Sequence, residues 1–295
     1  MQRFLDPAVL NAISGLDLVA KTVVDGFVAG LHRSADFGFS QEFAEYRAYT
    51  RGDDLRHVDW NVFARTERAY LKRYRGETNS QLTMLLDASN SMRFATHSVS
   101  KMDYARYIAA SLFYLATRKQ RDAAGLIVFD DEVREYIRPS TRAGQLNRLL
   151  AGLELAEPRA RTRFDAALEH FRTFLRRRGI VIILSDFYER PAEVVRAIEP
   201  LRFHGNEVVL FQILDPGELR PDLGSATVLV DLETQARIEV TSEYALRAYR
   251  DRIAAHVAEL RDAARAAGLT HHLLVTDQPL DAALRQYLQI RQGRD

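Results

Sequence analysis

The sequence predicts a three-layer α/β protein in which helices cover both faces of a doubly wound, mostly parallel six-stranded sheet. From about Gln81 onward, apolar runs of strand length alternate with longer helical patterns. Several runs are apolar almost throughout, which is typical of parallel strands buried on both faces. The predicted strands are Leu82–Leu86, Gly125–Phe129, Val133–Ile137, Ile180–Leu184, Glu207–Leu214 and Thr270–Val275. The predicted helices are Lys101–Lys119, Gln145–Leu153, Arg163–Arg176, Ala192–Arg202, Tyr244–Ala267 and Leu280–Ile290.

The junction between the second and third strands determines the expected strand order. Gly125–Phe129 and Val133–Ile137 are separated by residues 130–132 alone, which is too short for a parallel crossover. We therefore expect a hairpin whose second strand is antiparallel and lies at the sheet edge. With this hairpin as strands 2 and 3, the expected order is 3-2-1-4-5-6.

The first 80 residues are less regular than the rest. Pro7–Leu31 has apolar residues at helical spacing, and a strand-like segment follows at Tyr70–Arg75. We expect residues 1–80 to form an N-terminal helix and accessory segment, and residues 81–295 to form the main domain. A hairpin inserted at about residues 216–241 is expected to pack on the N-terminal segment as a small β-rich lobe. Its predicted strands are Ala226–Leu232 and Arg237–Val240.

The composition argues against several classes of protein. The chain has 295 residues and no cysteine, so it has no disulfide, thiolate zinc site or cysteine nucleophile. Its net charge of +1 provides no overall field that attracts nucleic acid. The N-terminus lacks a signal-peptide pattern, and the most apolar run, Tyr107–Ala116, is shorter than the roughly 20 residues that cross a bilayer. We expect a cytoplasmic protein that neither enters a membrane nor binds nucleic acid.

Hydroxyl and carboxylate groups follow the first core strand directly. Asp87, Ser89 and Ser91 form a D-x-S-x-S pattern on the turn at the carboxyl end of that strand. Such hard oxygen donors suit Mg²⁺, Mn²⁺ or Ca²⁺ better than softer metals. Taken alone the pattern is weak, because Asp and Ser are also ordinary turn and N-cap residues.

A second carboxylate is expected at the same edge of the sheet. Asp186 follows the strand Ile180–Leu184, which neighbours Leu82–Leu86 in the expected order. Asp87 and Asp186 should therefore converge at the topological switch point, where open α/β sheets bind ligands. A third loop supplies Thr162, whose alternative role is the N-cap of the following helix.

These five positions together resemble the metal-ion-dependent adhesion site of von Willebrand factor A-like (vWA) domains. The resemblance implies that Ser89 and Ser91 bind the metal directly and that Thr162 joins directly or through water. It also implies that Asp87 and Asp186 act mostly through water. The chain departs from the common pattern at Thr162, which lies between two arginines where such loops usually carry Gly-Gly-Thr-Asp.

The upstream segment from Glu42 to Arg65 resembles the signature of a bacterial vWA-like family called "domain of unknown function 58", here in its soluble short form. Further matches are Leu214-Asp215-Pro216, Asp231-Leu232-Glu233 and the tail from Thr276 to Arg291. Members of that family are commonly encoded beside MoxR-type AAA+ ATPases. The resemblance therefore implies that such an ATPase, or its client protein, is the partner.

Opposite charges interleaved with aromatic residues fill the segment from Arg47 to Arg65. A partly buried ion-pair network accounts for this pattern, because buried arginines prefer carboxylate partners. The alternative is a docking surface for another protein, and both interpretations remain open.

The sequence favours a non-enzymatic, metal-dependent protein-binding module that acts in the assembly or maturation of a protein complex. The alternative is a metal-dependent phosphatase or hydrolase with Asp87 as nucleophile. Such an enzyme needs a general acid two residues later, where this chain has Ser89, and a lysine near the site, which we do not expect. We therefore expect no catalytic residues.

Overall fold

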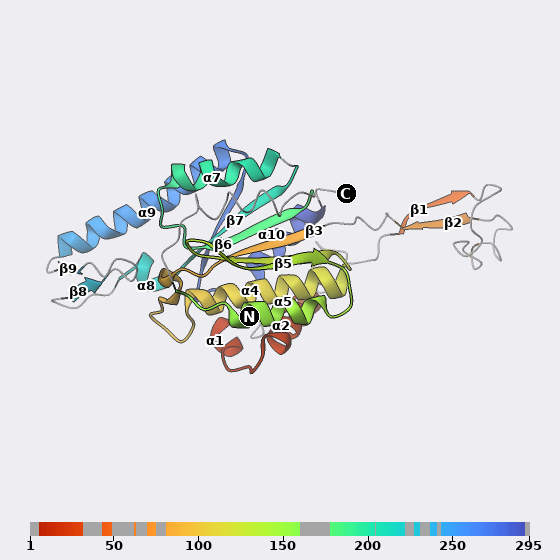
Figure 1. Ribbon diagram of the computed structural model, residues 1–295, viewed down its shortest axis with the longest axis horizontal. Helices are drawn as coiled ribbons and strands as arrows, with labels where there is room; N and C mark the ends of the chain where they lie inside the picture. The colour runs from red at the N-terminus through yellow and green to blue at the C-terminus, as the bar shows by residue number, and fades with distance from the viewer. Residues whose placement is uncertain are drawn as a thin grey trace. The chain divides into compact units, whose positions relative to one another are not determined.

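The computed structural model contains the expected six-stranded sheet, with the strands in the order β10-β7-β6-β3-β4-β5. Counted along the chain from β3, this order is 3-2-1-4-5-6, so the predicted topology is confirmed (Figure 1). The strands are β3 (Gln81–Asp87), β4 (Ala123–Phe129), β5 (Val133–Ser140), β6 (Ile180–Ser185), β7 (Glu207–Leu214) and β10 (Thr270–Val275). The structure describes residues 6–31, 43–48, 62, 70–74, 81–159, 178–203, 205–221, 227–230, 237–240 and 243–292.

One edge strand is antiparallel, as the short junction predicts. β5 pairs antiparallel with β4, whereas β3, β4, β6, β7 and β10 pair in parallel. The intervening turn is closed by Asp130, whose backbone N–H donates to the carbonyl of Glu132 at 3.0 Å. Arg134 from the start of β5 donates to both carboxylate oxygens of Asp130 at 2.9 Å. On its other edge β4 pairs with the central strand β3, which in turn pairs with β6.

Helices cover both faces of the sheet (Figure 1). One layer contains α4 (Lys101–Tyr114), the π-helical turn Leu115–Lys119, α5 (Gln145–Leu155) and α10 (Asp281–Gln292). The other contains α7 (Pro191–Phe203) and α9 (Glu243–Ala266). The predicted helix Arg163–Arg176 lies outside the described residues. None of the helices in the described part of the chain is both long and apolar enough to cross a membrane.

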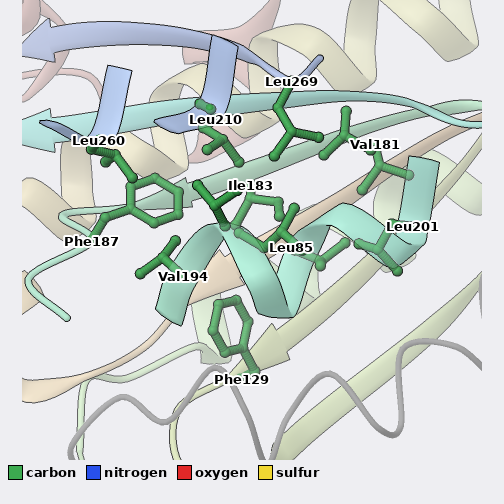
Figure 2. Packing of buried hydrophobic residues seen from close by; sticks show 14 of the residues in the cluster. Leu85, Phe129, Val181, Ile183, Phe187, Val194, Leu201, Leu210, Leu260 and Leu269 are labelled. Atoms are coloured by element: carbon green, nitrogen blue, oxygen red, sulfur yellow. The ribbon is translucent and has the colours of Figure 1, made fainter. Parts of the chain in front are cut away.

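The core between the sheet and the second helix layer is fully apolar (Figure 2). Leu85, Ile183 and Leu210 project from three neighbouring strands and meet Val194 of α7 and Leu260 of α9. Each of these side chains is completely buried. Burying one side chain of this size contributes about 1.5–3 kcal/mol, so this core fixes the central strands whose carboxyl ends carry the polar residues.

The N-terminal helix is broken into two pieces. α1 (Pro7–Leu10) and α2 (Leu16–Leu31) replace the single predicted helix, and Gly15 at the break has a φ of +86°. Glycine tolerates this left-handed conformation because it has no Cβ. Asn11, also at the break, donates to the carbonyl of Ser98 at 2.9 Å and accepts from the hydroxyl of Tyr107 at 3.0 Å.

The chain divides into two compact units. The first unit consists of Met1–Phe27 and Ser80–Asp295. It therefore begins again near the predicted boundary at residue 80 but also includes the N-terminal residues. The second unit, Val28–Asn79, contains the antiparallel pair β1 (Phe43–Ala48) and β2 (Tyr70–Tyr74). The inserted hairpin consists of β8 (Thr227–Val230) and β9 (Arg237–Val240), which form a separate two-stranded sheet. Its packing on the N-terminal segment stays a prediction, and most of the Arg47–Arg65 segment lies outside the described residues.

Candidate metal site

The D-x-S-x-S loop is shaped by Asp87, the last residue of β3. Its Oδ1 accepts the backbone N–H of Ser89 at 2.8 Å, the local turn that aspartate commonly forms. The hydroxyls of Ser89 and Ser91 lie 3.0 Å apart, and both residues are buried. Ala88, between Asp87 and Ser89, is held to the neighbouring strand, because its N–H donates to the carbonyl of Phe129 at 2.7 Å. The loop therefore presents two hydroxyl groups and one carboxylate from alternate positions, residues 87, 89 and 91.

The neighbouring strand β6 contributes to the same site through Ser185. Leu86 and Leu184 are paired in register, so the residues after them, Asp87 and Ser185, lie side by side. The Ser185 hydroxyl donates to Oδ2 of Asp87 at 2.5 Å and accepts the backbone N–H of Phe187 at 3.0 Å. Ser185 is completely buried. The sequence alone did not predict this contact between Ser185 and Asp87.

Asp87 and Asp186 are electrostatic neighbours, as the strand order predicts. Burial and, to a lesser extent, the negative charge of Asp186 raise the pKa of Asp87, which lies at about 7 instead of 3.8. Hydrogen bonds from Ser185 and Ser89 oppose this shift without cancelling it. The two carboxylates therefore repel each other in a buried place, and a cation near both would relieve that repulsion.

The chain turns sharply after Asp186. Phe187 has a φ of +53°, a left-handed conformation that costs a residue other than glycine about 1–3 kcal/mol. Its ring is completely buried in the apolar core of Figure 2, which compensates for this strain. Gln212 of β7 holds the turn, because its Nε2 donates to the backbone carbonyl of Asp186 at 3.1 Å. Asp186 is thus fixed by two neighbouring strands.

A lysine lies against this site, contrary to expectation. Lys101, the first residue of α4, is completely buried, and its Nζ donates to Oδ2 of Asp186 at 2.8 Å. The same ammonium donates to Oε1 of Glu218 at 2.6 Å. Burial lowers the pKa of Lys101, but the charges of Asp186 and Glu218 outweigh it and leave the pKa above its usual value. The prediction that no lysine lies near the site is wrong.

Glu218 belongs to the short helix α8 (Pro216–Leu219), which follows β7. Its Oε2 accepts the backbone N–H of Asp215 at 2.8 Å, and the Asp215 side chain accepts the N–H of Gly217 at 2.7 Å. The Asp215 side chain also accepts the backbone N–H of Glu218, so Asp215 and Glu218 form a capping box, which satisfies the first N–H groups of a helix. Burial and the charge of Asp186 raise the pKa of Glu218, while Lys101 opposes the shift.

Four of the five predicted metal-binding residues can be placed. Asp87, Ser89, Ser91 and Asp186 are at the carboxyl ends of β3 and β6. Thr162 lies outside the described residues. The segment that leads toward it is attached to the serine loop, since the N–H of Arg159 donates to the carbonyl of Ala88 at 2.9 Å.

The donor set fits a hard divalent cation. Hydroxyl and carboxylate oxygens are the ligands that Mg²⁺, Mn²⁺ and Ca²⁺ prefer. Among the described residues, the ammonium of Lys101 is paired with two buried carboxylates, Asp186 and Glu218, and the charge of Asp186 acts on a third, Asp87. When all four groups are ionised, two negative charges remain, which a divalent cation would neutralise.

Comparison with known proteins agrees with the observed fold and with the family signature in the sequence. The family model "Protein of unknown function DUF58" matches residues 45–263. The "Uncharacterized protein Rv1480" of Mycobacterium tuberculosis is 29% identical over 290 residues, which cover 97% of this chain and 90% of that protein.

Two solved structures are similar in fold. An aerotolerance-related membrane protein from Bacteroides fragilis superposes with a TM-score of 0.50 and 17% identity, over 71% of this chain and 97% of that one. The SpRpn10 VWA domain superposes with a TM-score of 0.43 and 12% identity, over 70% of this chain and 94% of that one.

Proposed function

The chain belongs to the DUF58 family, and we propose that it is a non-enzymatic protein-binding module whose binding depends on a divalent metal. The observation that carries this proposal is the cluster of Asp87, Ser89, Ser91 and Asp186 at the switch point of the sheet. The vWA-like fold itself points to a protein-interaction module.

Mg²⁺ is the metal we propose, with Mn²⁺ or Ca²⁺ as substitutes in the same oxygen-rich site. Ser89, Ser91 and Thr162 would hold it, and Asp87 and Asp186 would orient its water ligands. When bound, the metal supplies a positive centre at the end of the sheet. The chain's own residues do the rest: Ser185 and the Ser89 backbone fix the Asp87 carboxylate, and Gln212 fixes the turn at Asp186.

A metal held by few protein oxygens keeps open coordination positions. We propose that a carboxylate side chain of the partner protein fills one of them, so that metal and partner bind together. The partner would be a MoxR-type AAA+ ATPase or its client protein, and the process the assembly or maturation of a protein complex. We propose the cytoplasm as the place where this occurs.

The alternative function is a metal-dependent phosphatase or hydrolase. One group that this enzyme requires, a lysine near the site, is present as Lys101. That enzyme needs Asp87 as an exposed nucleophile, however, and Asp87 is completely buried. Its two oxygens accept hydrogen bonds from the Ser89 backbone and the Ser185 hydroxyl. Turnover of a generic phosphate ester with Mg²⁺, lost in Asp87→Asn, would favour the enzyme.

The test compares metal binding and partner capture in the same variants. We expect Asp87→Ala and Ser89→Ala to abolish the binding of Mg²⁺ and Mn²⁺ in calorimetric titration while the fold is retained. Ser140→Ala, which removes a serine at the end of the edge strand, is the matched control. In a pull-down, the two site variants should not capture the proposed MoxR-type ATPase, and the wild type should not capture it in the presence of chelator. Equal capture in all conditions would show that the metal does not join the partners and would leave Arg47–Arg65 as the candidate docking surface.

A further inference from the structure

Lys101 occupies a place that a lysine rarely takes. Its side chain is completely buried, and its ammonium lies 4.7 Å from the ring centre of Tyr188 and 5.8 Å from that of Phe94. A buried lysine is costly unless it is paired, and a buried ion pair often stabilises a protein no more than apolar residues would. The chain has only four lysines among its 41 basic residues (Lys and Arg). A role beyond packing therefore needs to be sought for this one.

The carboxylate that Lys101 holds is one of the predicted metal partners. The ammonium donates to Asp186 Oδ2 and is anchored on its other side by Glu218, which is in turn fixed by the cap of α8. An ammonium on Asp186 neutralises part of the charge that would attract a metal. It also takes up an oxygen that could otherwise accept from a metal-bound water.

We infer that Lys101 competes with the divalent cation for Asp186 and so keeps the metal site weak. This inference rests on the proposed function and adds its regulation. A weak site retains its metal poorly alone and better when the partner's carboxylate completes the coordination. Metal binding and partner binding would then reinforce each other, and Lys101 would set the metal concentration at which both occur.

The direct test is Mn²⁺ titration of the full chain, wild type against Lys101→Met. Methionine has a similar volume and no charge. We expect it to tighten Mn²⁺ binding at least tenfold, because Asp186 loses its internal cation. Lys119→Met is the matched control, since Lys119 is a half-exposed lysine about 27 Å further along the same helical segment. This control should leave the affinity unchanged.

Glu218→Gln tests whether Mn²⁺ binding weakens when Lys101 is left to Asp186. Glutamine retains an oxygen that can accept from the Asp215 N–H but leaves Lys101 with Asp186 as its only charged partner among the contacts described. We expect Mn²⁺ binding to weaken several-fold. A purely structural role of the ion pair would instead weaken binding in both Lys101→Met and Glu218→Gln.

The double variant Lys101→Met/Glu218→Gln distinguishes the competition of Lys101 for Asp186 from an effect of net charge. It can also be used if Lys101→Met alone does not fold. It carries the same net charge as the wild type but frees Asp186, so it should still bind Mn²⁺ more tightly. The melting temperature difference between Mn²⁺ and chelator provides a second readout, which should be larger in both Lys101 variants than in the wild type.

The outcomes distinguish this inference from the function on which it rests. If the wild type binds no Mn²⁺ but the Lys101 variants do, competition is supported and the proposed metal dependence of the native protein fails. If the wild type binds Mn²⁺ and the variants bind it equally or less tightly, the inference is overturned and the proposed function stands. No binding by any variant overturns both.

Discussion

The Ser185 hydroxyl donates to Asp87 Oδ2 at 2.5 Å and so joins the carboxyl ends of the two central strands, β6 and β3. Both residues are completely buried. Burial and the charge of Asp186 keep the pKa of Asp87 near 7, although three hydrogen bonds from Ser185 and Ser89 lower it. Burial and the charge of Asp186 therefore dominate at Asp87 among the residues that the structure describes, and four predictions follow from this balance and the contacts around it.

The first prediction concerns the pH dependence of stability without metal. The pKa of Asp87 rises from 3.8 to about 7 on folding, mainly through burial, so the folded chain binds the proton more tightly than the unfolded chain. This group's contribution to stability is therefore most favourable below pH 4 and declines as the pH rises to about 7. The slope is at most about 1.4 kcal/mol per pH unit. Asp87→Asn should remove this slope and be more stable than the wild type at pH 8.

The measurement is urea unfolding in chelator at several pH values between 5 and 8. Other groups contribute slopes of the opposite sign in this range, as His271 does because burial lowers its pKa from 6.5 to about 4. The difference between wild type and Asp87→Asn is therefore the quantity to follow. Parallel curves for the two proteins would mean that Asp87 is ionised throughout this range.

The second prediction concerns Ser185→Ala. The substitution removes one hydroxyl that makes two buried hydrogen bonds, to Asp87 and from the N–H of Phe187. Unfolding free energy should fall by about 1–3 kcal/mol, because the Phe187 N–H is left without this acceptor. The loss should be larger at pH 8 than at pH 5.5, since the hydrogen bond from Ser185 favours the ionised form of Asp87. Ser140→Ala, at the end of the edge strand, should change stability by less than about 0.5 kcal/mol.

Much of this site could be predicted because it depends on strand ends. Apolar runs located β3 and β6 to within a residue or two, and the short turn before β5 determined their adjacency. Asp87 and Asp186 then had to lie at the same edge of the sheet. The first helix was mispredicted as continuous because apolar spacing alone does not register the left-handed Gly15.

Lys101 was missed for a different reason. It was predicted only as the first residue of the helix Lys101–Lys119, although its spacing to Ala105, Ile108 and Leu112 places it on the buried face of α4. That periodicity was a usable signal. The sequence contained no such signal for Glu218, because this residue reaches Lys101 from the short helix α8, more than a hundred residues further along the chain. Long-range ion pairs of this kind depend on tertiary packing that one sequence does not reveal.

The third prediction concerns the support of Asp186 by the next strand. Gln212 is completely buried, donates to the Asp186 carbonyl at 3.1 Å and lies 3.0 Å from Nε2 of His271. Gln212→Met preserves the volume but leaves that carbonyl without this donor, so stability should fall by about 1–3 kcal/mol. Mn²⁺ affinity should fall several-fold as the turn loosens. His271→Leu is the control: it removes the other contact of Gln212 and should leave the affinity unchanged.

The fourth prediction links metal binding to protons. A cation beside Asp87 needs the ionised carboxylate, and the pKa near 7 means that much of this group is protonated at neutral pH without metal. Binding should therefore release close to one proton below pH 7 and progressively less above it. The apparent Kd for Mn²⁺ should rise about tenfold for each pH unit below 7, which corresponds to about 1.4 kcal/mol. The affinity should level off by pH 8.

Calorimetric titration in buffers of different ionisation enthalpy measures this proton release directly. At pH 6 the observed heat should vary with the buffer, and at pH 8 the variation should nearly vanish. Ser91→Ala is the informative companion, because it removes a neutral donor and leaves the Asp87 carboxylate in place. It should weaken Mn²⁺ binding at every pH while keeping the same proton release. A wild-type affinity independent of pH between 6 and 8 would show that the metal does not depend on the ionised Asp87, and Ser89 and Ser91 would then carry the binding without it.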